Sequence, residues 1–269
     1  MILFNGKLQD EPLNCSPFSL HFQYGTGFFE TILYNKGLFF YEEHLKRMRN
    51  TCKDFCIDLN WDDISEDKLV RLLGKKKDSE FRLKILYAPL KEDSSRWDTV
   101  VTMQPYKRRD NPMTAALHCT EPYNNSLHHY KSTNYEYHRY WCSHYKNRGM
   151  DEVLFSPDGK RALEGSYTNI IVRKGKTLYF APPTLPCLPG IAQEKILEWA
   201  NKSGYKLKPV KKGFTHAQLR SGEEVILTNS LLLAENLISL KIKEKIYTLG
   251  QEKILRNAIR ENFLNSRGI

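Results

Sequence analysis

The sequence lacks long apolar runs and paired cysteines. No stretch approaches the roughly 18 apolar residues that a membrane-spanning helix needs, and Met1–Gly6 shows no charged region followed by an apolar one, as a secretory leader would. The six cysteines include no C-x-x-C pair, so no zinc or other metal site is expected. Cys52 and Cys56, at i and i+4, are expected to share a helix face. These absences predict a cytoplasmic protein with no membrane partner.

Acidic residues are fewer than basic ones. Lys and Arg number 41 against 31 Asp and Glu, which gives a formal charge of +10. The basic runs at 75–77 and 211–212 are short and lack interleaved aromatics, which favours solvated loops over a nucleic-acid surface. A basic RNA- or DNA-binding protein without catalysis remains an alternative that only the charge supports. The positive field would also attract an anionic substrate.

The mixture of periodic segments predicts an α+β fold. The chain has 269 residues, 41% of them hydrophobic, which is enough for one large or two moderate domains. Strands and helices mix in both halves without strict βαβ alternation. A charged, proline-flanked stretch at 105–113 reads as a linker, so we expect an N-terminal domain over 1–110 and a C-terminal domain over 114–269.

The spacing of apolar residues and the positions of turn-forming residues predict where the helices and strands lie. The Asn-Lys-Gly turn at 35–37 predicts a hairpin that joins strands 28–34 and 38–40. Helices are expected at 41–56, 66–73, 134–147, 191–201 and 249–265. Further strands are expected at 1–4, 7–9, 81–87, 99–103, 115–119, 152–155, 169–173, 177–180 and 224–228.

Two residues suggest pyridoxal-phosphate chemistry. Lys131 could supply an amine for an imine, and Glu164, 33 residues later on a turn before a β-branched strand, could pair with a pyridine nitrogen. Each residue alone is better explained as an ordinary surface group. Together, and with the segments that follow, they become a candidate site.

Two other segments could bind a phosphate. The Pro-Gly pair at 189–190 opens a predicted helix, whose first amides and dipole attract anions. Arg47 lies three residues after His44 on the first long helix and offers a fork of donors. In isolation, a helix start and a surface cation are common features.

In this order, the segments resemble the fold-type IV pyridoxal-phosphate enzymes. That family contains branched-chain and D-amino-acid aminotransferases and 4-amino-4-deoxychorismate lyase. The resemblance runs from residue 4 to about residue 240, and it implies a small N-terminal domain and a larger C-terminal domain that binds pyridoxal 5'-phosphate. The matching motifs are Y-G-T-G-F-F-E-T at 24–31, E-H-L-K-R at 43–47, K-S-T-N at 131–134, D-E-V-L at 151–154, E-G-S at 164–166 and L-P-G-I at 188–191.

The resemblance also implies roles for individual residues. Lys131 would form the imine and move protons, and Glu164 would bind the pyridine nitrogen. The cofactor phosphate would meet Arg47, Gly190, Ile191, Ala192, Asn229 and Ser230, and Tyr135 would approach its phenolic oxygen. Ala192 departs from the commoner Thr or Ser. Candidates to bind the substrate are Tyr24, Lys84 and Arg82.

The resemblance is closest to the lyase. Thr31 stands where lyases of this family carry a threonine, and residues 228–231 read T-N-S-L where aminotransferases more often show G-T-A. The R-x-H pair of D-amino-acid transaminases is not visible in 87–98. We therefore expect 4-amino-4-deoxychorismate lyase activity, which makes 4-aminobenzoate and pyruvate for folate synthesis. The alternative is a branched-chain or D-amino-acid aminotransferase, and in either case the family implies a homodimer.

Overall fold

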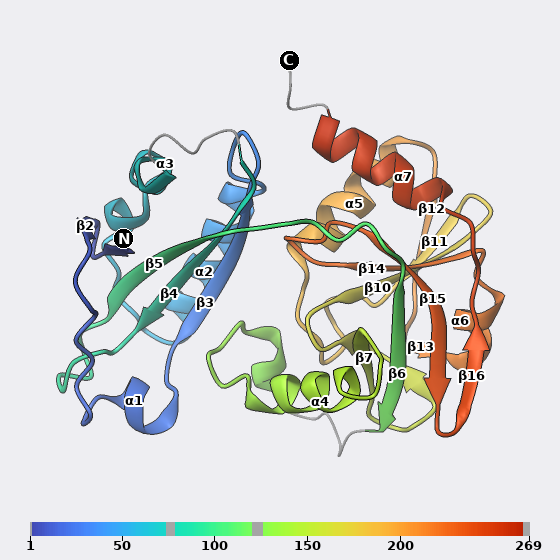
Figure 1. Ribbon diagram of the computed structural model, residues 1–269, viewed down its shortest axis with the longest axis horizontal. Coiled ribbons are helices and arrows are strands. Elements are labelled where there is room, and N and C mark those ends of the chain that lie inside the picture. Colours follow the sequence, from blue (N-terminus) through green and yellow to red (C-terminus); the bar gives the residue numbers. More distant parts are fainter. Residues whose placement is uncertain (1, 74–78, 120–125, 266–269) are drawn as a thin grey trace. The chain divides into compact units, whose positions relative to one another are not determined.

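The computed structural model describes residues 2–73, 79–119 and 126–265 and shows mixed helices and strands (Figure 1). Two compact units divide the chain. Unit 1 comprises residues 1–107 and 130–135, and unit 2 comprises residues 108–129 and 136–269. The first division, between residues 107 and 108, falls within the predicted linker. The segment 130–135 groups with unit 1, because Lys131 and Thr133 form backbone hydrogen bonds with residues of that unit.

Unit 1 is built on an antiparallel sheet with the order β2-β1-β5-β4-β3. Alternation decides which side chains enter its core. In β3, Phe28, Ile32 and Tyr34 join the buried cluster, whereas Phe29, Thr31 and Leu33 point to the other face. The strands are β1 (Ile2–Phe4), β2 (Lys7–Gln9), β3 (Phe28–Tyr34), β4 (Phe81–Ala88) and β5 (Asp98–Pro105).

One long helix covers the core face of this sheet. Leu45, Met48 and Cys52 of α2 (Tyr41–Asp54) recur at helical spacing and pack in the same cluster as the strand residues. The shorter helices are α1 (Leu20–Tyr24), η1 (Trp61–Ile64) and α3 (Glu66–Leu73). Edge strand β3 therefore has α2 on one face. On its other face, which we call the open face, Phe29 and Thr31 are partly exposed and Leu33 is buried.

Unit 2 contains a larger mixed sheet with the order β12-β11-β10-β14-β15-β6-β7-β9, and β16 pairs with β15. A separate ribbon joins β8 and β13. The strands are β6 (Met113–Cys119), β7 (Glu152–Ser156), β8 (Arg161–Ala162), β9 (Glu164–Gly165), β10 (Asn169–Lys174), β11 (Thr177–Phe180), β12 (Lys206–Pro209), β13 (Phe214–Thr215), β14 (Glu224–Thr228), β15 (Glu235–Ile242) and β16 (Lys245–Thr248).

Both faces of the central strands of unit 2 are covered. In β10, Ile170 and Val172 enter one buried cluster, whereas Ile171 enters another with residues of α5 and α7. This explains the continuous apolar run in that strand. The helices are η2 (Ser126–His129), α4 (Glu136–Lys146), α5 (Ile191–Lys202), α6 (His216–Ser221), α7 (Ile254–Arg260) and the single π-helical turn η3 (Glu261–Asn265).

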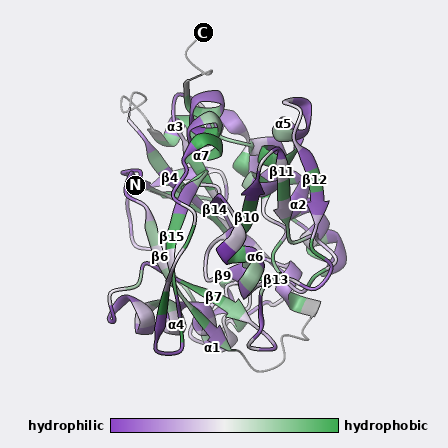
Figure 2. Cartoon of the chain, turned by 90° about the vertical axis from the view of Figure 1, so that its right-hand side faces the viewer, coloured by the Kyte–Doolittle hydropathy of each residue, from purple (hydrophilic) through white to green (hydrophobic). Residues whose placement is uncertain are grey.

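Edge strand β12 is coloured as hydrophilic in Figure 2. Its lysines, Lys206 and Lys208, are charges of the kind that discourage edge-to-edge association. Within the described residues, no helix is long and apolar enough to cross a membrane.

The hairpin predicted at 28–40 forms, but its second arm is shorter than expected. β3 pairs with β4, and beyond the turn a single bridge between Tyr34 and Leu38 precedes α2. Phe39 and Phe40 are buried: Phe39 N donates to Leu33 O at 2.9 Å, and Phe40, with a φ of 55°, is the N-cap residue from which α2 begins. The terminal helix begins at Ile254 and not at 249. The lysines at 75–77 lie outside the described residues.

The core of unit 1 can be tested at the centre of its sheet. Leu83 of β4 is fully buried, so Leu83→Ala is expected to lower the free energy of unfolding by about 2–5 kcal/mol. Denaturant titration measures this. Leu8→Ala is the matched control, because Leu8 is 48% exposed, and it is expected to change stability by less than about 0.5 kcal/mol.

Candidate active site

The segment that carries Lys131 extends the sheet of unit 1. Phe29 N donates to Lys131 O at 2.9 Å, Thr133 N donates to Gly27 O at 2.9 Å, and Phe28 bridges Ser132. Gly27 allows this approach, because a Cβ there would lie 3.2 Å from Thr133 Oγ1 and 2.9 Å from the Ala88 Cβ. These contacts fix the backbone of a lysine that lies about a hundred residues away in sequence.

The amine of Lys131 lies among aromatic rings. Its Nζ is 4.7 Å from the Phe29 ring centre and 5.6 Å from that of Tyr135. The two rings meet edge to face at 5.7 Å. Lys84 Nζ lies 4.4 Å from the same Phe29 ring. The amines of Lys131 and Lys84 and the phenol of Tyr135 thus gather around Phe29 on the open face of β3.

Thr31 and Arg82 belong to this face as well. Thr31 is two residues after Phe29 on β3 and pairs in register with Lys84. Arg82 is two residues before Lys84 and donates to Gln104 Oε1. Tyr24 ends α1 with 69% exposure, and among the described residues no recorded contact joins it to this group.

A buried polar group lies on the opposite face of β3. The Glu30 carboxylate accepts hydrogen bonds from Arg47 Nε at 2.7 Å and Arg47 Nη2 at 2.6 Å. It also accepts from His44 Nδ1 at 2.6 Å. Glu30 and His44 are 1% and 0% exposed. His44 and Arg47 are one helical turn apart on α2, so both reach the same carboxylate.

The charges of this group stabilise one another. Burial alone would raise the pKa of Glu30, but Arg47 and His44 outweigh it and lower that pKa to about 2. Burial lowers the pKa of His44 despite the carboxylate, and the charge of Lys131 acts in the same direction. Burial disfavours the charge of Arg47, yet Glu30 raises its pKa above the ordinary value. Glu30 and Arg47 are thus ionised at neutral pH.

In unit 2, Glu164 is buried at the end of a short ribbon. One of its carboxylate oxygens accepts from the Leu188 backbone N at 3.0 Å, which ties β9 to the segment before α5. The neighbouring turn is held by Glu152, whose carboxylate accepts from Ser166 N at 3.1 Å and Thr168 Oγ1 at 3.1 Å. Burial raises the pKa of Glu152.

The start of α5 is shaped by a glycine. Gly190 is the N-cap residue, and no side chain caps the helix there. A Cβ at Gly190 would lie 1.9 Å from Asn169 Oδ1, and Asn169 Nδ2 donates to Leu188 O at 2.9 Å. The amides of Ile191 and Ala192 are at helix positions that have no intrahelical acceptor. They could bind an anion.

The turn after β14 contains the two other predicted phosphate ligands. Asn229 stabilises the turn itself: its Nδ2 donates to Tyr167 O at 3.2 Å, and its Oδ1 accepts from Leu232 N at 2.7 Å. Ser230 is half-buried in the same turn. Thr228, which pairs with Asn169 across the sheet, has a buried hydroxyl without a partner among the described residues.

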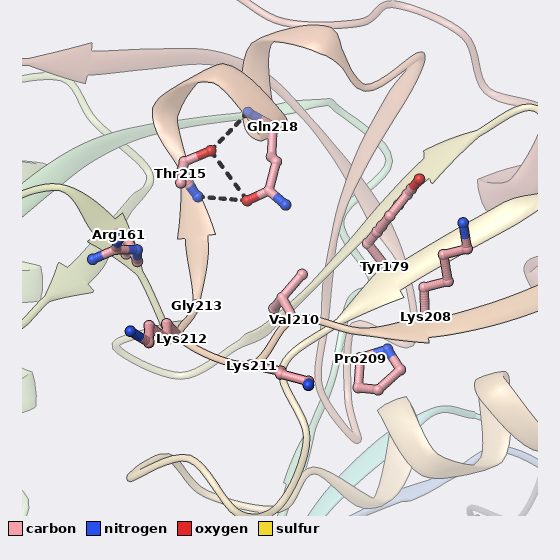
Figure 3. Close-up of a pocket in the computed structure, with 10 residues that line it drawn as sticks. All are labelled: Arg161, Tyr179, Lys208, Pro209, Val210, Lys211, Lys212, Gly213, Thr215 and Gln218. Atoms are coloured by element: carbon pink, nitrogen blue, oxygen red, sulfur yellow. Dashed lines mark hydrogen bonds between the residues drawn. The ribbon is translucent and has the colours of Figure 1, made fainter.

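A cavity of about 470 Å³ lies elsewhere in unit 2, between β8, β12 and β13 (Figure 3). Its wall includes Arg161, Lys208, Lys211 and Lys212. These cations point in different directions in Figure 3, and Arg161 pairs with Asp158 at 2.6 Å. They do not converge on one point, so this cavity is not the predicted phosphate site.

The family described as Amino-transferase class IV matches residues 27–234. The chain belongs to this family. That span contains Glu30, Arg47, Lys131, Glu164 and the start of α5.

Individual relatives of this class IV protein carry different activities. A D-alanine aminotransferase from Bacillus licheniformis is 25% identical, with 85% of this chain and 84% of the relative covered. An aminodeoxychorismate lyase from Bacillus subtilis is 24% identical, with coverage of 86% and 84%. A hypothetical aminotransferase from Mycobacterium tuberculosis in its PLP-bound form has a TM-score of 0.88 and 18% identity, covering 99% of this chain and 100% of that one. The predicted fold is confirmed.

The family and the PLP-bound structure indicate pyridoxal 5'-phosphate as the cofactor. The donors present in this class IV protein fit that group. Unit 1 contains the Lys131 amine, and unit 2 contains the buried Glu164 carboxylate and the first amides of α5, which are the kinds of donor and acceptor that an aldehyde, a pyridine nitrogen and a phosphate require. The unpartnered Thr228 hydroxyl next to Asn169 is a further donor in the same unit.

Glu30, His44, Phe29 and Thr228 were missed as site residues. The signal for Glu30 was present, because it occupies a core-facing position between Phe28 and Ile32 in an alternating strand. A carboxylate at such a position requires a charged partner. The E-H-L-K-R helix supplies two, but sequence alone does not show which strand that helix covers.

The depressed pKa of Glu30 predicts acid sensitivity. Its stabilising contribution is complete above the ordinary carboxyl pKa of 4.5 and is lost as the pH falls towards 2. The difference in free energy of unfolding between wild type and Glu30→Gln is therefore expected to shrink across that window, by on the order of 3 kcal/mol. Denaturant titrations at several pH values measure it. A pH-independent difference would contradict the ionised pair.

The crowding at Gly190 gives a second prediction for this site. Gly190→Ala is expected to lower the melting temperature and weaken cofactor binding, because the new methyl meets Asn169 Oδ1. In an Asn169→Ala background the same substitution is expected to cost clearly less. Equal costs in both backgrounds, measured by thermal melting, would show that this contact is not the cause.

Proposed function

We propose that this class IV protein is a pyridoxal-phosphate-dependent 4-amino-4-deoxychorismate lyase that releases 4-aminobenzoate and pyruvate in folate synthesis. One observation carries the choice of reaction. Thr31 shares the open face of β3 with Phe29, on whose ring the Lys131 amine lies. A hydroxyl on the same side as the amine suits delivery of a proton to a leaving group, which elimination needs and transamination does not, because no group leaves in transamination.

The charges on this face support an anionic substrate. Lys84 pairs in register with Thr31, and Arg82 projects from the same face of β4. Chorismate derivatives carry two carboxylates, and two cations beside the reacting amine would bind and orient them. Tyr24 completes the proposed substrate contacts.

We assign the following roles in the proposed lyase reaction to residues of this chain. When bound, pyridoxal phosphate supplies an electron sink. Lys131 would hold the cofactor through its amine and, once the substrate amine has taken its place, would remove the C4 proton of the substrate. Glu164 would hold the pyridine nitrogen in its protonated form. As the C3–O bond breaks, Thr31, with Lys131, passes a proton to the methylene carbon of the departing enolpyruvyl group, so that pyruvate leaves and the ring becomes aromatic.

Phosphate binding is assigned to Arg47, to the amides at Gly190, Ile191 and Ala192, and to the turn at Asn229 and Ser230. Because Asn229 already uses both ends of its amide within the turn, we expect it to act by holding Ser230 in place. Tyr135 is proposed to bind the phenolic oxygen of the cofactor.

The second candidate is a D-amino-acid or branched-chain aminotransferase. The similarity to a D-alanine aminotransferase favours it about as much as the similarity to the lyase favours our choice. In that reaction Lys131 would move the proton from the substrate Cα to the cofactor, and Thr31 would have no part.

We also propose that the protein is a cytoplasmic homodimer that binds no nucleic acid. Four apolar side chains around α1 are exposed and lack a covering element within unit 1. They are Phe18, Leu20, Phe22 and Tyr24. Exposed aromatic patches of this kind mark interfaces between proteins.

The amine assignment is tested by colour and by product. Purified wild type is expected to be yellow and to form 4-aminobenzoate from aminodeoxychorismate, whereas Lys131→Ala should be colourless and inactive. Parallel incubation with D- or branched-chain amino acids and 2-oxoglutarate decides between the enzymes. Glutamate production in place of 4-aminobenzoate would overturn the lyase assignment and support the aminotransferase.

The proton relay gives a separate prediction. Thr31→Ala is expected to reduce the rate of 4-aminobenzoate formation about a hundredfold, as typical of losing a positioned proton donor, while the yellow complex forms normally. Thr31→Ser should retain most of the activity because it keeps the hydroxyl. Unchanged product formation in Thr31→Ala would refute the relay.

A further inference from the structure

We propose that Glu30 is a positioning residue for the cofactor phosphate, whose carboxylate holds the Arg47 guanidinium in the orientation that binds this phosphate. The inference rests on the proposed function, because it assumes that Arg47 binds the phosphate. It assigns a role in cofactor recognition to a strand residue that itself touches no part of the proposed ligand.

The geometry is that of a two-point clamp. Glu30 accepts from Arg47 Nε at 2.7 Å and from Nη2 at 2.6 Å, so one edge of the planar guanidinium is fixed. An arginine side chain has several rotatable bonds and loses considerable freedom when it is ordered. Contact with Glu30 supplies that order before any ligand arrives.

The carboxylate is itself held in place. His44 Nδ1 donates to it at 2.6 Å, and the strand register fixes its backbone on β3. The His44 ring is fully buried, and its Nε2 has no partner among the described residues. Within the described chain, Glu30 is therefore the group that orients the ring, and the three side chains form one buried unit.

Two opposite effects decide what Glu30 does to phosphate binding. Its negative charge repels a phosphate and neutralises part of the attraction of Arg47. Its clamp, in contrast, keeps Arg47 from turning toward water, where a buried cation without a partner would go. Arg47 is 15% exposed, so an outward path exists. Because hydrogen bonds to charged groups are strong and directional, we infer that the clamp prevails.

The test compares two ligands that differ in the phosphate alone. Dissociation constants of pyridoxal 5'-phosphate and of pyridoxal are measured from the absorbance of the complex with Lys131, in wild type and in Glu30→Gln. The variant is expected to lose about tenfold or more of the preference for the phosphorylated ligand, as for a lost charge-assisted contact, while pyridoxal binding stays nearly constant. Glu42→Gln, the same change at an exposed position of α2, should leave the preference intact.

Other outcomes overturn the inference. An unchanged preference in Glu30→Gln would mean that Arg47 needs no clamp, and an increased preference would mean that Glu30 acts only as a repelling charge. An equal loss for both ligands would indicate a general structural role.

If Glu30→Gln does not fold, Arg47→Lys provides the second measurement, because it keeps the charge and loses the fork. It should show the same loss of preference, and a wild-type preference would refute the clamp. A wild-type protein that forms no yellow complex would overturn the proposed function as well. A yellow wild type with an unaffected preference in the variants overturns this inference alone.

Discussion

The pairing of residues 131–133 with the N-terminal end of β3 is the constraint on which the candidate site depends. It fixes Lys131 opposite Phe29 and therefore chooses the face on which the amine lies. A shift of this pairing by one residue would turn the amine to the α2 face, among the core residues of unit 1. The reactive group is thus placed by backbone hydrogen bonds, which depend little on the side chains around it.

Because side chains alternate along edge strand β3, neighbouring residues of the candidate site point to opposite faces of the sheet. Phe29 and Thr31 lie on the open face, where the amines gather. Glu30, between them, points into the core and meets Arg47 and His44. The charge of Lys131 nevertheless acts on His44, so the two faces are electrostatically coupled around the strand edge. Because the two groups of side chains occupy opposite faces of one seven-residue strand, they do not compete for the same space.

Much of the fold could be predicted because local signals agreed with tertiary structure. The helix over 41–54 has apolar residues at helical spacing, and the strand over 169–174 is continuously apolar because helices and strands cover both of its faces. The strand over 235–242 was missed, since its mixed sequence shows no clear alternation. The 28–40 hairpin is shorter than predicted, because turn chemistry does not say how far the chain after the turn stays paired before a helix begins.

Individual residues of the candidate site could be predicted from the sequence, but the contacts between them could not. Lys131, Glu164 and Gly190 could be chosen from motifs, whereas the partners of Glu30 depend on which helix covers which strand. Long-range pairing of this kind leaves no trace in a single sequence.

The open face of β3 and β4 also bears on how such enzymes diversify. Thr31, Lys84 and Arg82 stand on a surface row, while the scaffold beneath them is closed by Ile32, Leu83 and their neighbours. Replacing a residue in that row leaves the apolar interior undisturbed, so little stability is lost. A lineage could therefore exchange one reaction for another through a few surface substitutions, with the anchoring residues inherited unchanged.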